Sequence, residues 1–495
     1  MLHIKSWQSS PQGIHPIILG WLGVCLLLTS CLGRGRELTE AEQSAFGIYV
    51  NEMDSTLSGV WFDRMGVSPD ADSVLAYLSR EVPRNGLDTA AFFLPQIARD
   101  LEIVHQLAFD SVGVSINELL PRLEARLSKA YIRYVTGQRY GFMKPRVFNR
   151  LDHKVGHPDI FARVFDDDPA LPDTTVAAKK MGESDRVAYL QSSAPSSYIY
   201  QALLREMDQT TDAGKRRLLA VNMERCRWQI AHPEANQRQI LVNIAAQQLW
   251  AINSDSVLNM RICCGAVPTK TPLLHSAISY MQVNPEWVIP QNIVKNEVVH
   301  HAGDSAFFAR NRYAIIDKAS GDTLQVTHVD ADALLSGKLR VSQKSGPGNS
   351  LGRIVFRFPN DYSIYLHDTN NHSAFQRERR TLSHGCVRVE KPFELACFLL
   401  PDVDEWTRES IRISMDMPPV TDRGREWLRQ HADAPRPFRL ISYHDVQPDV
   451  PLYILYYTAF PNPQTGAVEY WPDLYGFDKV MSQELKWISG ESSNR

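Results

Sequence analysis

The sequence predicts an α+β protein that is helical in its first part and mainly β in its second. Two observations carry this prediction. Up to about residue 207, apolar residues recur every three or four positions, as in amphipathic helices. After about residue 222, short runs of β-branched and aromatic residues alternate with turn sequences. A chain of 495 residues is long enough for about two to four domains with a substantial core.

In the helical part, the clearest element is expected over residues 115–135, where apolar residues form one stripe. Ser115 and Glu118 have the spacing of a capping box, although Pro121 suggests that the helix starts a few residues later. The Asp- and Pro-rich segment 165–175 predicts a loop.

In the β part, residues 240–244 predict a strand, and residues 248–252 and 257–262 predict a hairpin. Residues 346–352, rich in glycine, predict a tight turn between strands. A short helix is expected after Pro392, over 393–400. Further strands are expected over 313–316, 353–356, 363–366 and 451–460, the last turned by 462–466.

Composition and charge exclude several classes of protein. The chain has 53 basic and 56 acidic side chains and a formal charge of −3, which argues against a nucleic-acid partner. With 44% hydrophobic and 22% charged residues, it is neither disordered nor fibrous. Its apolar runs are all shorter than the roughly 20 residues that span a bilayer as a helix.

The N-terminus resembles the signal peptide of a bacterial lipoprotein. Residues 17–28 form an apolar run of signal-peptide length, and Leu28-Thr-Ser-Cys31 resembles a lipobox. We therefore expect removal of residues 1–30, lipidation of Cys31 and export to the periplasm. Leu32 stands where an aspartate often retains lipoproteins in the inner membrane, so the outer membrane is expected. The alternative is a short buried helix with an incidental cysteine.

Cysteine usage fits an exported enzyme better than a disulfide scaffold. Seven cysteines are present; Cys25 would be cleaved away and Cys31 acylated. The odd number that remains leaves at least one thiol free. No CxxC spacing occurs, so neither a zinc ribbon nor a thioredoxin-like motif is predicted. The five cysteines that remain are Cys226, Cys263, Cys264, Cys386 and Cys397.

The densest chemical pattern is His367 followed, 19 residues later, by Cys386 within Ser383-His-Gly-Cys-Val-Arg388. A histidine near a cysteine can generate the nucleophilic thiolate. Gly385 removes bulk so that backbone N–H groups can face an oxyanion, and Arg388 could hold a carboxylate or a carbonyl oxygen. Two alternatives stay open: a buried structural cysteine, or a zinc site of His367, His384 and Cys386 with or without His372.

These motifs resemble the catalytic domain of the L,D-transpeptidases (YkuD type), whose pattern Ser383–Arg388 fits at every position. The wider chain resembles the large YcbB-like branch, which has a helical scaffold domain. The resemblance implies a scaffold over 31–221 and a catalytic domain over 222–420 with a lid near 293–339. A C-terminal extension, 421–495, would pack on the catalytic domain. The motifs that carry the wider resemblance are Tyr365–Thr369, Gly346–Gly352, Trp287–Pro290 and Asn222–Arg225.

The resemblance also implies residue roles, with no cofactor and no metal. Cys386 would be the nucleophile and His367 the base; His384, Gly385 and Cys386 would line the oxyanion pocket, assisted by Arg388. We expect Tyr365, Ser383 and Arg380 to bind substrate. For Arg380, a solvated loop shared with Arg377 and Arg379 is the alternative.

The implied reaction is ping-pong acyl transfer on peptidoglycan stem peptides. Cys386 would attack a tetrapeptide stem, D-Ala would leave, and the side-chain amine of a second stem would accept the acyl group in a 3→3 cross-link. Carbapenems, which acylate this family, would label Cys386. Alternatives are an L,D-carboxypeptidase or endopeptidase that hydrolyses the same acyl-enzyme, or a non-catalytic lipoprotein that tethers the wall. The oligomeric state stays open.

Overall fold

The computed structural model describes residues 59–151, 164–254 and 256–485. The predicted signal peptide (1–30), the lipidation site Cys31 and the first part of the predicted helical region lie outside these residues. None of the described helices is both long and apolar enough to cross a membrane. Two compact units are present, and each is described by itself.

The first unit comprises residues 59–139 and 172–194 and is helical apart from one short hairpin. The predicted helix is present as α6, and its apolar stripe, from Leu119 to Tyr134, is buried. The elements are β1 (Phe62–Asp63), β2 (Gly66–Val67), α3 (Pro69–Arg84), η1 (Ala90–Phe92), α4 (Leu94–His105), α5 (Phe109–Val112), α6 (Ile116–Tyr140), α8 (Thr174–Met181) and α9 (Arg186–Gln191).

Helix α6 begins directly after Ser115, so the expectation of a later start was wrong. The Ser115 hydroxyl accepts the backbone N–H of Asn117 at 3.1 Å, as an N-capping serine does. Pro121 lies inside the second turn. Its ring removes one backbone hydrogen bond close to the end of a long helix, where the remaining turns and the buried stripe hold the structure.

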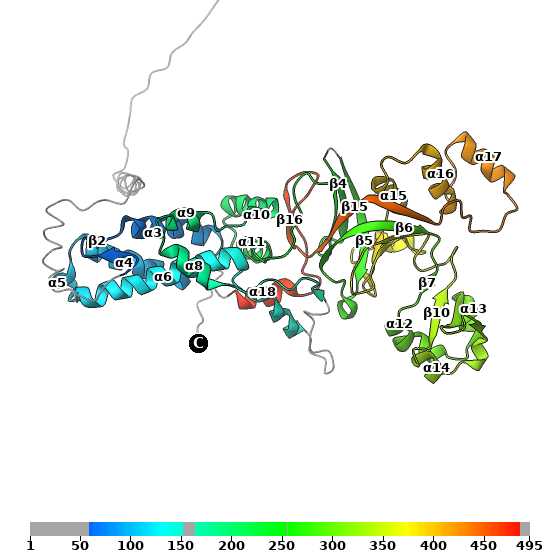
Figure 1. The fold of residues 1–495 in the computed structure, drawn as a ribbon, viewed down its shortest axis with the longest axis horizontal. Helices are drawn as coiled ribbons and strands as arrows, with labels where there is room; N and C mark the ends of the chain where they lie inside the picture. The colour runs from blue at the N-terminus through cyan, green and yellow to red at the C-terminus, as the bar shows by residue number, and fades with distance from the viewer. Residues whose placement is uncertain (1–58, 152–163, 255, 486–495) are drawn as a thin grey trace, which may run out of the picture. The chain divides into compact units, whose positions relative to one another are not determined.

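The second unit comprises residues 140–171 and 195–485 and contains most of the strands (Figure 1). Its helices are η2 (Pro145–Leu151), α10 (Tyr198–Gln209), α11 (Ala213–Arg225), η3 (Val267–Thr269), α12 (Gln291–Asn296), η4 (Val298–His301), α13 (Ser305–Arg310), η5 (Val326–His328), α14 (Ala331–Leu335), η6 (His372–Gln376), α15 (Pro392–Leu399), α16 (Glu405–Ser414), α17 (Asp422–Gln430) and α18 (Phe477–Glu484). The helical-then-β order predicted from the sequence is confirmed.

Most described strands of this unit belong to one mixed sheet, in the order β13-β5-β14-β12-β11-β6-β15-β3-β4. Because β4 also pairs with β5, the sheet closes into a ring to which β13 attaches. The strands are β3 (Gln239–Asn243), β4 (Gln248–Asn253), β5 (Ser256–Gly265), β6 (Leu274–Val283), β11 (Ile354–Arg357), β12 (Leu366–His367), β13 (Thr381–Ser383), β14 (Val387–Val389) and β15 (Tyr443–Leu455). A separate hairpin joins β16 (Ala459–Pro461) and β17 (Val468–Tyr470).

Two strand predictions were wrong in extent. Of residues 363–366 only Leu366 is in a strand, β12; the segment before it turns, because Ser363 has a φ of 55° and the Asn360 side chain accepts the N–H groups of Tyr362 and Ile364. Residues 451–460 are divided between β15 and β16. The predicted hairpin of β4 and β5 is confirmed, as is the turn at residues 346–352, which joins β10 (Leu339–Gln343) to β11.

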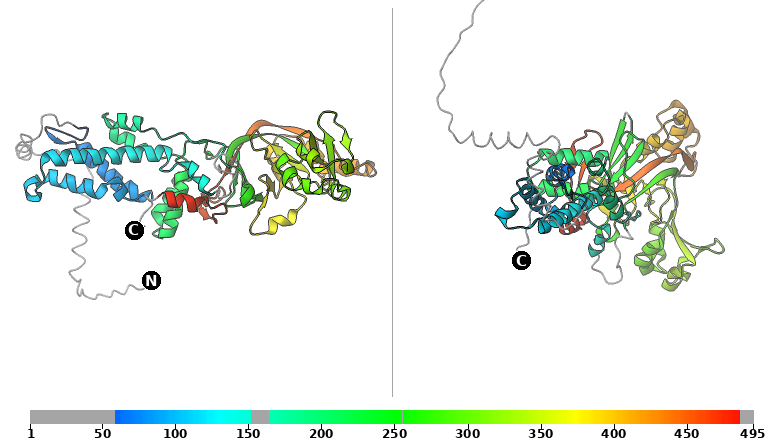
Figure 2. Two further views of the ribbon diagram at one scale, coloured as in Figure 1. Left: turned by 90° about the horizontal axis from the view of Figure 1, so that it is seen from below. Right: turned by 60° about the vertical axis from the view of Figure 1, so that its left-hand side comes forward.

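The C-terminal region is part of the sheet, so its description as an extension packed on the catalytic domain needs correction. Strand β15 lies between β6 and β3, and Figures 1 and 2 show it in orange among the green strands. The expected boundary at residue 221 falls inside α11, which belongs to the second unit. Local sequence patterns do not show which strands pair with one another. The domain boundaries expected from the sequence therefore left β15 outside the sheet.

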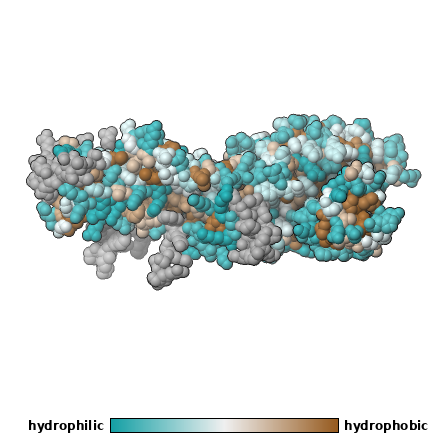
Figure 3. Space-filling view, turned by 60° about the horizontal axis from the view of Figure 1, so that its bottom comes forward, coloured by the Kyte–Doolittle hydropathy of each residue, from teal (hydrophilic) through white to brown (hydrophobic). Residues whose placement is uncertain are grey.

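The predicted lid region forms a small lobe with its own core (Figure 1). This insert, residues 287–343, contains a four-stranded sheet of β7 (Trp287–Val288), β10 (Leu339–Gln343), β8 (Tyr313–Asp317) and β9 (Thr323–Leu324) among its described strands. Helices α12, α13 and α14 cover it. Apolar side chains also reach the surface over the insert (Figure 3), where Val288 and Leu335 are exposed.

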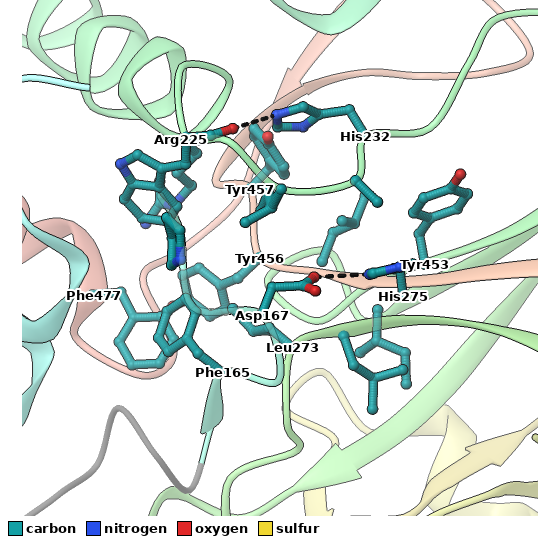
Figure 4. Close-up of a pocket in the computed structure, with 17 residues that line it drawn as sticks. Phe165, Asp167, Arg225, His232, Leu273, His275, Tyr453, Tyr456, Tyr457 and Phe477 are labelled. Carbon is teal, nitrogen blue, oxygen red and sulfur yellow. Dashed lines mark hydrogen bonds and ion pairs between the residues drawn. The ribbon is translucent and has the colours of Figure 1, made fainter. Parts of the chain in front are cut away.

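A cavity of about 40 Å³ lies in the aromatic core of the second unit (Figure 4). Apolar side chains such as Phe165, Tyr456 and Phe477 line it, and an ion pair of 2.8 Å between His275 Nδ1 and Asp167 borders it. The cavity has room for one or two water molecules only. Its lining includes no residue of the His367–Cys386 motifs, so this cavity is not the catalytic site.

Candidate active site

Parallel pairing of β12 with β14 brings the two halves of the chemical pattern together. Leu366 pairs with Val387, and His367 pairs with Arg388. Residues two apart on a strand share one face of a sheet. Cys386, directly before β14, and Tyr365, directly before β12, therefore fall on the same face as His367 and Arg388. The Tyr365 and His367 rings contact edge to face, with centroids 6.3 Å apart.

Burial keeps both reacting groups neutral. It raises the pKa of the Cys386 thiol to about 11, although a backbone N–H at Tyr365 and the charges of Arg357 and Arg388 act in the opposite direction. Burial and the Arg388 charge lower the pKa of His367 to about 3. The resting pair is therefore a thiol and a neutral imidazole. A neutral imidazole of this kind can accept a proton from a neighbouring thiol.

The loop that carries the cysteine has a fixed conformation. The Ser383 hydroxyl accepts the N–H of Gly385 at 3.1 Å and donates to the carbonyl of Cys386 at 2.5 Å. Gly385 has a φ of 124°, which L-residues rarely adopt. Because its N–H is engaged by Ser383, Gly385 does not offer it to an oxyanion. The backbone N–H of Cys386 has no acceptor among the described residues and is the available donor.

Thr271 and Tyr475 hold this loop in place through hydrogen bonds. The Thr271 hydroxyl donates to the carbonyl of Gly385 at 2.8 Å and accepts the N–H of Gly265 at 2.8 Å. The Tyr475 hydroxyl accepts the N–H of Thr271 and donates to the carbonyl of Gly265. In a trans peptide the C=O and N–H point in opposite directions. By holding the Gly385 carbonyl on one side, Thr271 turns the Cys386 N–H toward the other.

Two family models match the chain at these positions. Residues 237–408, which contain His367 and Cys386, match the L,D-transpeptidase catalytic domain (YkuD), and residues 56–207 match the Scaffold domain. The chain carries a YkuD-type L,D-transpeptidase catalytic domain after a scaffold domain. The expected family and its YcbB-like architecture are confirmed.

A Haemophilus influenzae protein named "Putative L,D-transpeptidase" is 28% identical over 307 residues. The match covers 60% of this chain and 57% of that protein, so the chain spans little more than half of the relative's length. The catalytic-domain model ends at residue 408, whereas the sheet continues into β15.

The His384 side chain of the YkuD domain lies at the surface and pairs with the insert. Its side chain is about half exposed, and its Nε2 lies 2.6 Å from the carboxylate of Glu297 in the insert. The insert therefore contacts the catalytic loop directly. His384 thus belongs to the loop through its backbone, whereas its side chain is engaged by Glu297.

Arg380 is placed differently from the expectation. Its guanidinium is buried and donates to the carbonyls of Ile262 and Gln247, both at 3.0 Å, and of Arg377 at 2.8 Å. These carbonyls use its donors to hold the loop before β13, so a substrate-binding role has no support. Ser383 is also buried and acts within the catalytic loop. Among the described residues, no group of three or more His, Cys, Asp or Glu side chains is arranged to hold a metal ion.

Three residues that contact the YkuD site were not predicted from the sequence. Thr271 braces the catalytic loop, Glu297 pairs with His384, and the Arg357 guanidinium lies 4.3 Å from the centre of the Tyr365 ring. Each comes from a segment far from the Ser383–Arg388 motif. The strand order brings them to the site, and no local pattern marks them.

The pKa values predict how the thiol reacts with a neutral alkylating agent. Below a pKa of about 11, the thiolate fraction rises tenfold per pH unit. Alkylation of Cys386 by iodoacetamide should therefore rise about tenfold per unit between about pH 7 and 9.5, while His367 stays neutral. Mass spectrometry of the Cys386 peptide measures the rate. A plateau below pH 8 would indicate a preformed thiolate–imidazolium pair and contradict this electrostatic description.

The brace predicts a specific effect of Thr271. Thr271→Val keeps the size but removes the hydroxyl, and should lower kcat for acylation about 10- to 100-fold with little change in KM, because the oxyanion donor loses its orientation. Thr271→Ser should recover most of the rate. Stopped-flow acylation by a tetrapeptide or a carbapenem measures both variants. Equal impairment of valine and serine variants would assign Thr271 to packing alone.

Proposed function

We propose that the protein is a peptidoglycan L,D-transpeptidase that works through a thioester on Cys386. The observation that carries the proposal is the parallel pairing of β12 with β14, which sets a buried neutral His367 and the Cys386 thiol on one face. The fixed loop that offers the Cys386 N–H supports it. A buried structural cysteine would need neither a neighbouring imidazole nor a braced loop.

The proposed first half-reaction is acylation. His367 accepts the proton of Cys386 Sγ while the sulfur attacks the carbonyl carbon of the donor stem, and the oxyanion forms beside the Cys386 N–H. The amide C–N bond then breaks. The leaving D-Ala amine takes the proton from His367, which leaves a thioester and a neutral imidazole.

The proposed second half-reaction reverses these roles. The amine of a second stem attacks the thioester carbon, and His367 takes a proton from that amine. The C–S bond breaks, and the sulfur regains the proton from His367. The product is an amide that cross-links two stems, and the enzyme returns to its thiol form.

The test is product analysis by mass spectrometry after incubation of the full chain with purified tetrapeptide muropeptides. The proposal expects 3→3 dimers and free D-Ala. Tripeptide monomers alone would show a carboxypeptidase. Cleavage of purified cross-linked dimers would show an endopeptidase. No change in any substrate would leave a tethering protein as the function.

We also propose that the protein is exported and anchored through lipid on Cys31, in the outer membrane facing the periplasm. The sequence of the lipobox supports this proposal. Metabolic labelling with a fatty acid tests it. Label should appear in the natural protein and be lost in Cys31→Ser, whereas label that persists in the variant would contradict the anchor.

A further inference from the structure

A row of side chains crosses the sheet next to the nucleophile. Arg357, the last residue of β11, pairs with Tyr280 of β6. On its other side, the register of β11 and β12 places it opposite Tyr365, and its guanidinium lies 4.3 Å from that ring. Tyr365 in turn neighbours the Cys386 strand, since its carbonyl accepts the N–H of Val387 at 3.1 Å. A cation therefore stands two strands away from the nucleophile.

This cation lacks an acidic partner. Arg357 has neutral neighbours, the Tyr365 ring and the Gln282 amide oxygen at 3.4 Å. Its Nε is buried without an acceptor, as is the Nε of Arg388 on the Cys386 side. Among the described residues, no carboxylate lies within 4 Å of either guanidinium. Both arginines are partly buried, and two neighbouring cations whose buried Nε groups lack an acceptor indicate a place for an anion.

Other partly or fully buried arginines of the same unit show the contrast. Arg353 pairs with Asp416, Arg261 with Glu390, and Arg225 with Asp478. These three arginines have an acid, and the buried Arg380 has three backbone carbonyls as acceptors instead. Arg357 and Arg388 are left without one on the face that carries Cys386 and His367.

The distances fit a carboxylate on the substrate. Neighbouring strands are about 4.8 Å apart, so the Arg357 Cα lies roughly 10 Å from that of Cys386, within range of a long side chain that points toward the nucleophile. In a peptide, the terminal carboxylate carbon follows the attacked carbonyl carbon by three bonds, at most about 3.8 Å. Guanidinium groups bind carboxylates in a bidentate manner.

We propose that Arg357, with Arg388 nearby, binds the free carboxylate of the terminal residue that leaves, and thereby restricts the enzyme to the last amide bond of a stem. The inference rests on the proposed function for its substrate class. It explains why a sheet that holds a nucleophile also holds an uncompensated cation two strands away. Arg357 is then the residue that distinguishes a chain end from an internal peptide bond.

Binding without turnover tests this directly. In the Cys386→Ala background, calorimetry compares a tetrapeptide ending in a carboxylate with the same peptide ending in a carboxamide. The carboxylate should bind about 10- to 100-fold more tightly, the range for hydrogen bonds to charged groups. Adding Arg357→Gln should remove this difference by weakening only the carboxylate peptide. Arg357→Lys should recover part of it, since it keeps the charge but loses the fork.

Arg429→Gln is the matched control, because Arg429 is exposed on α17 and pairs with Glu426 there. It should keep the full preference for the carboxylate. Equal affinity of the two peptides for the Cys386→Ala protein, or a preference that survives Arg357→Gln, would overturn the inference. Failure of the proposed function looks different: the carboxylate preference would be present, yet the natural protein would form no acyl-enzyme.

Discussion

Replacing Cys386 with alanine should abolish acyl transfer, leaving no cross-linked product above the background without enzyme. The reason is that Cys386 lies on the same face as His367 and is partly exposed beside an available backbone N–H, whereas Cys263, which the register also places on that face, is fully buried. Cys386→Ser should be nearly inactive, because an alkoxide is much harder to generate than a thiolate with an imidazole base. Mass spectrometry of muropeptide products measures both variants.

Cys397→Ala is the matched control. Cys397 is also a free, partly exposed thiol whose pKa is raised by burial, but it lies on α15, outside the site. This variant should keep the activity of the natural protein. Cross-linking that persists in Cys386→Ala, or that disappears in Cys397→Ala alone, would contradict the choice of nucleophile.

Replacing His367 with alanine should slow acylation by about 10²–10⁴-fold, the usual contribution of a positioned general base. The largest expected decrease in rate follows from the pKa of the Cys386 thiol. With a pKa of about 11, roughly one Cys386 in 10⁴ is a thiolate at pH 7, and the variant must react through that fraction. The rate of the variant should therefore rise about tenfold per pH unit, whereas the natural protein should change much less.

His384→Ala provides the comparison, because the His384 side chain pairs with Glu297 at the surface and has no contact with the buried imidazole. It should cost much less than His367→Ala, and its rate should not show the steep rise with pH. A His384 variant as slow as the His367 variant would show that the roles of the two histidines are reversed.

The sequence was sufficient for the parts of the site that lie in continuous motifs. Cys386 and His367 could be proposed from the sequence because both lie in short motifs that resemble the L,D-transpeptidase pattern. The order of helical and β regions could also be predicted, since hydrophobic periodicity reports it locally.

The residues that shape the site could not be found in this way. Thr271 and Arg357 contact the catalytic loop and Tyr365 only because β5, β6, β11, β12 and β14 are neighbours in one sheet. Nothing near either residue in the sequence indicates that pairing. The same holds for β15, which is central in the sheet although it lies close to the C-terminal end of the described chain.

For Arg380, the sequence suggested a role in substrate binding that the position of its side chain does not support. Its position beside other arginines suggested an exposed cationic loop, but its side chain turns inward and is used by backbone carbonyls. A run of charges in the sequence does not show which member of the run points into the protein. Arg357, which has no other arginine beside it in the sequence, instead lies next to the Tyr365 ring with its Nε buried and without an acceptor.

Trapping the acyl-enzyme shows whether Cys386 carries the acyl group. The full chain is mixed with a tetrapeptide donor in the absence of an acceptor, quenched in acid, and examined by intact-protein mass spectrometry and peptide mapping. We expect a mass increase equal to that of the stem without its terminal residue, located on the peptide that contains Cys386. An adduct on another residue, or cross-linked product formed without any adduct on Cys386, would contradict it.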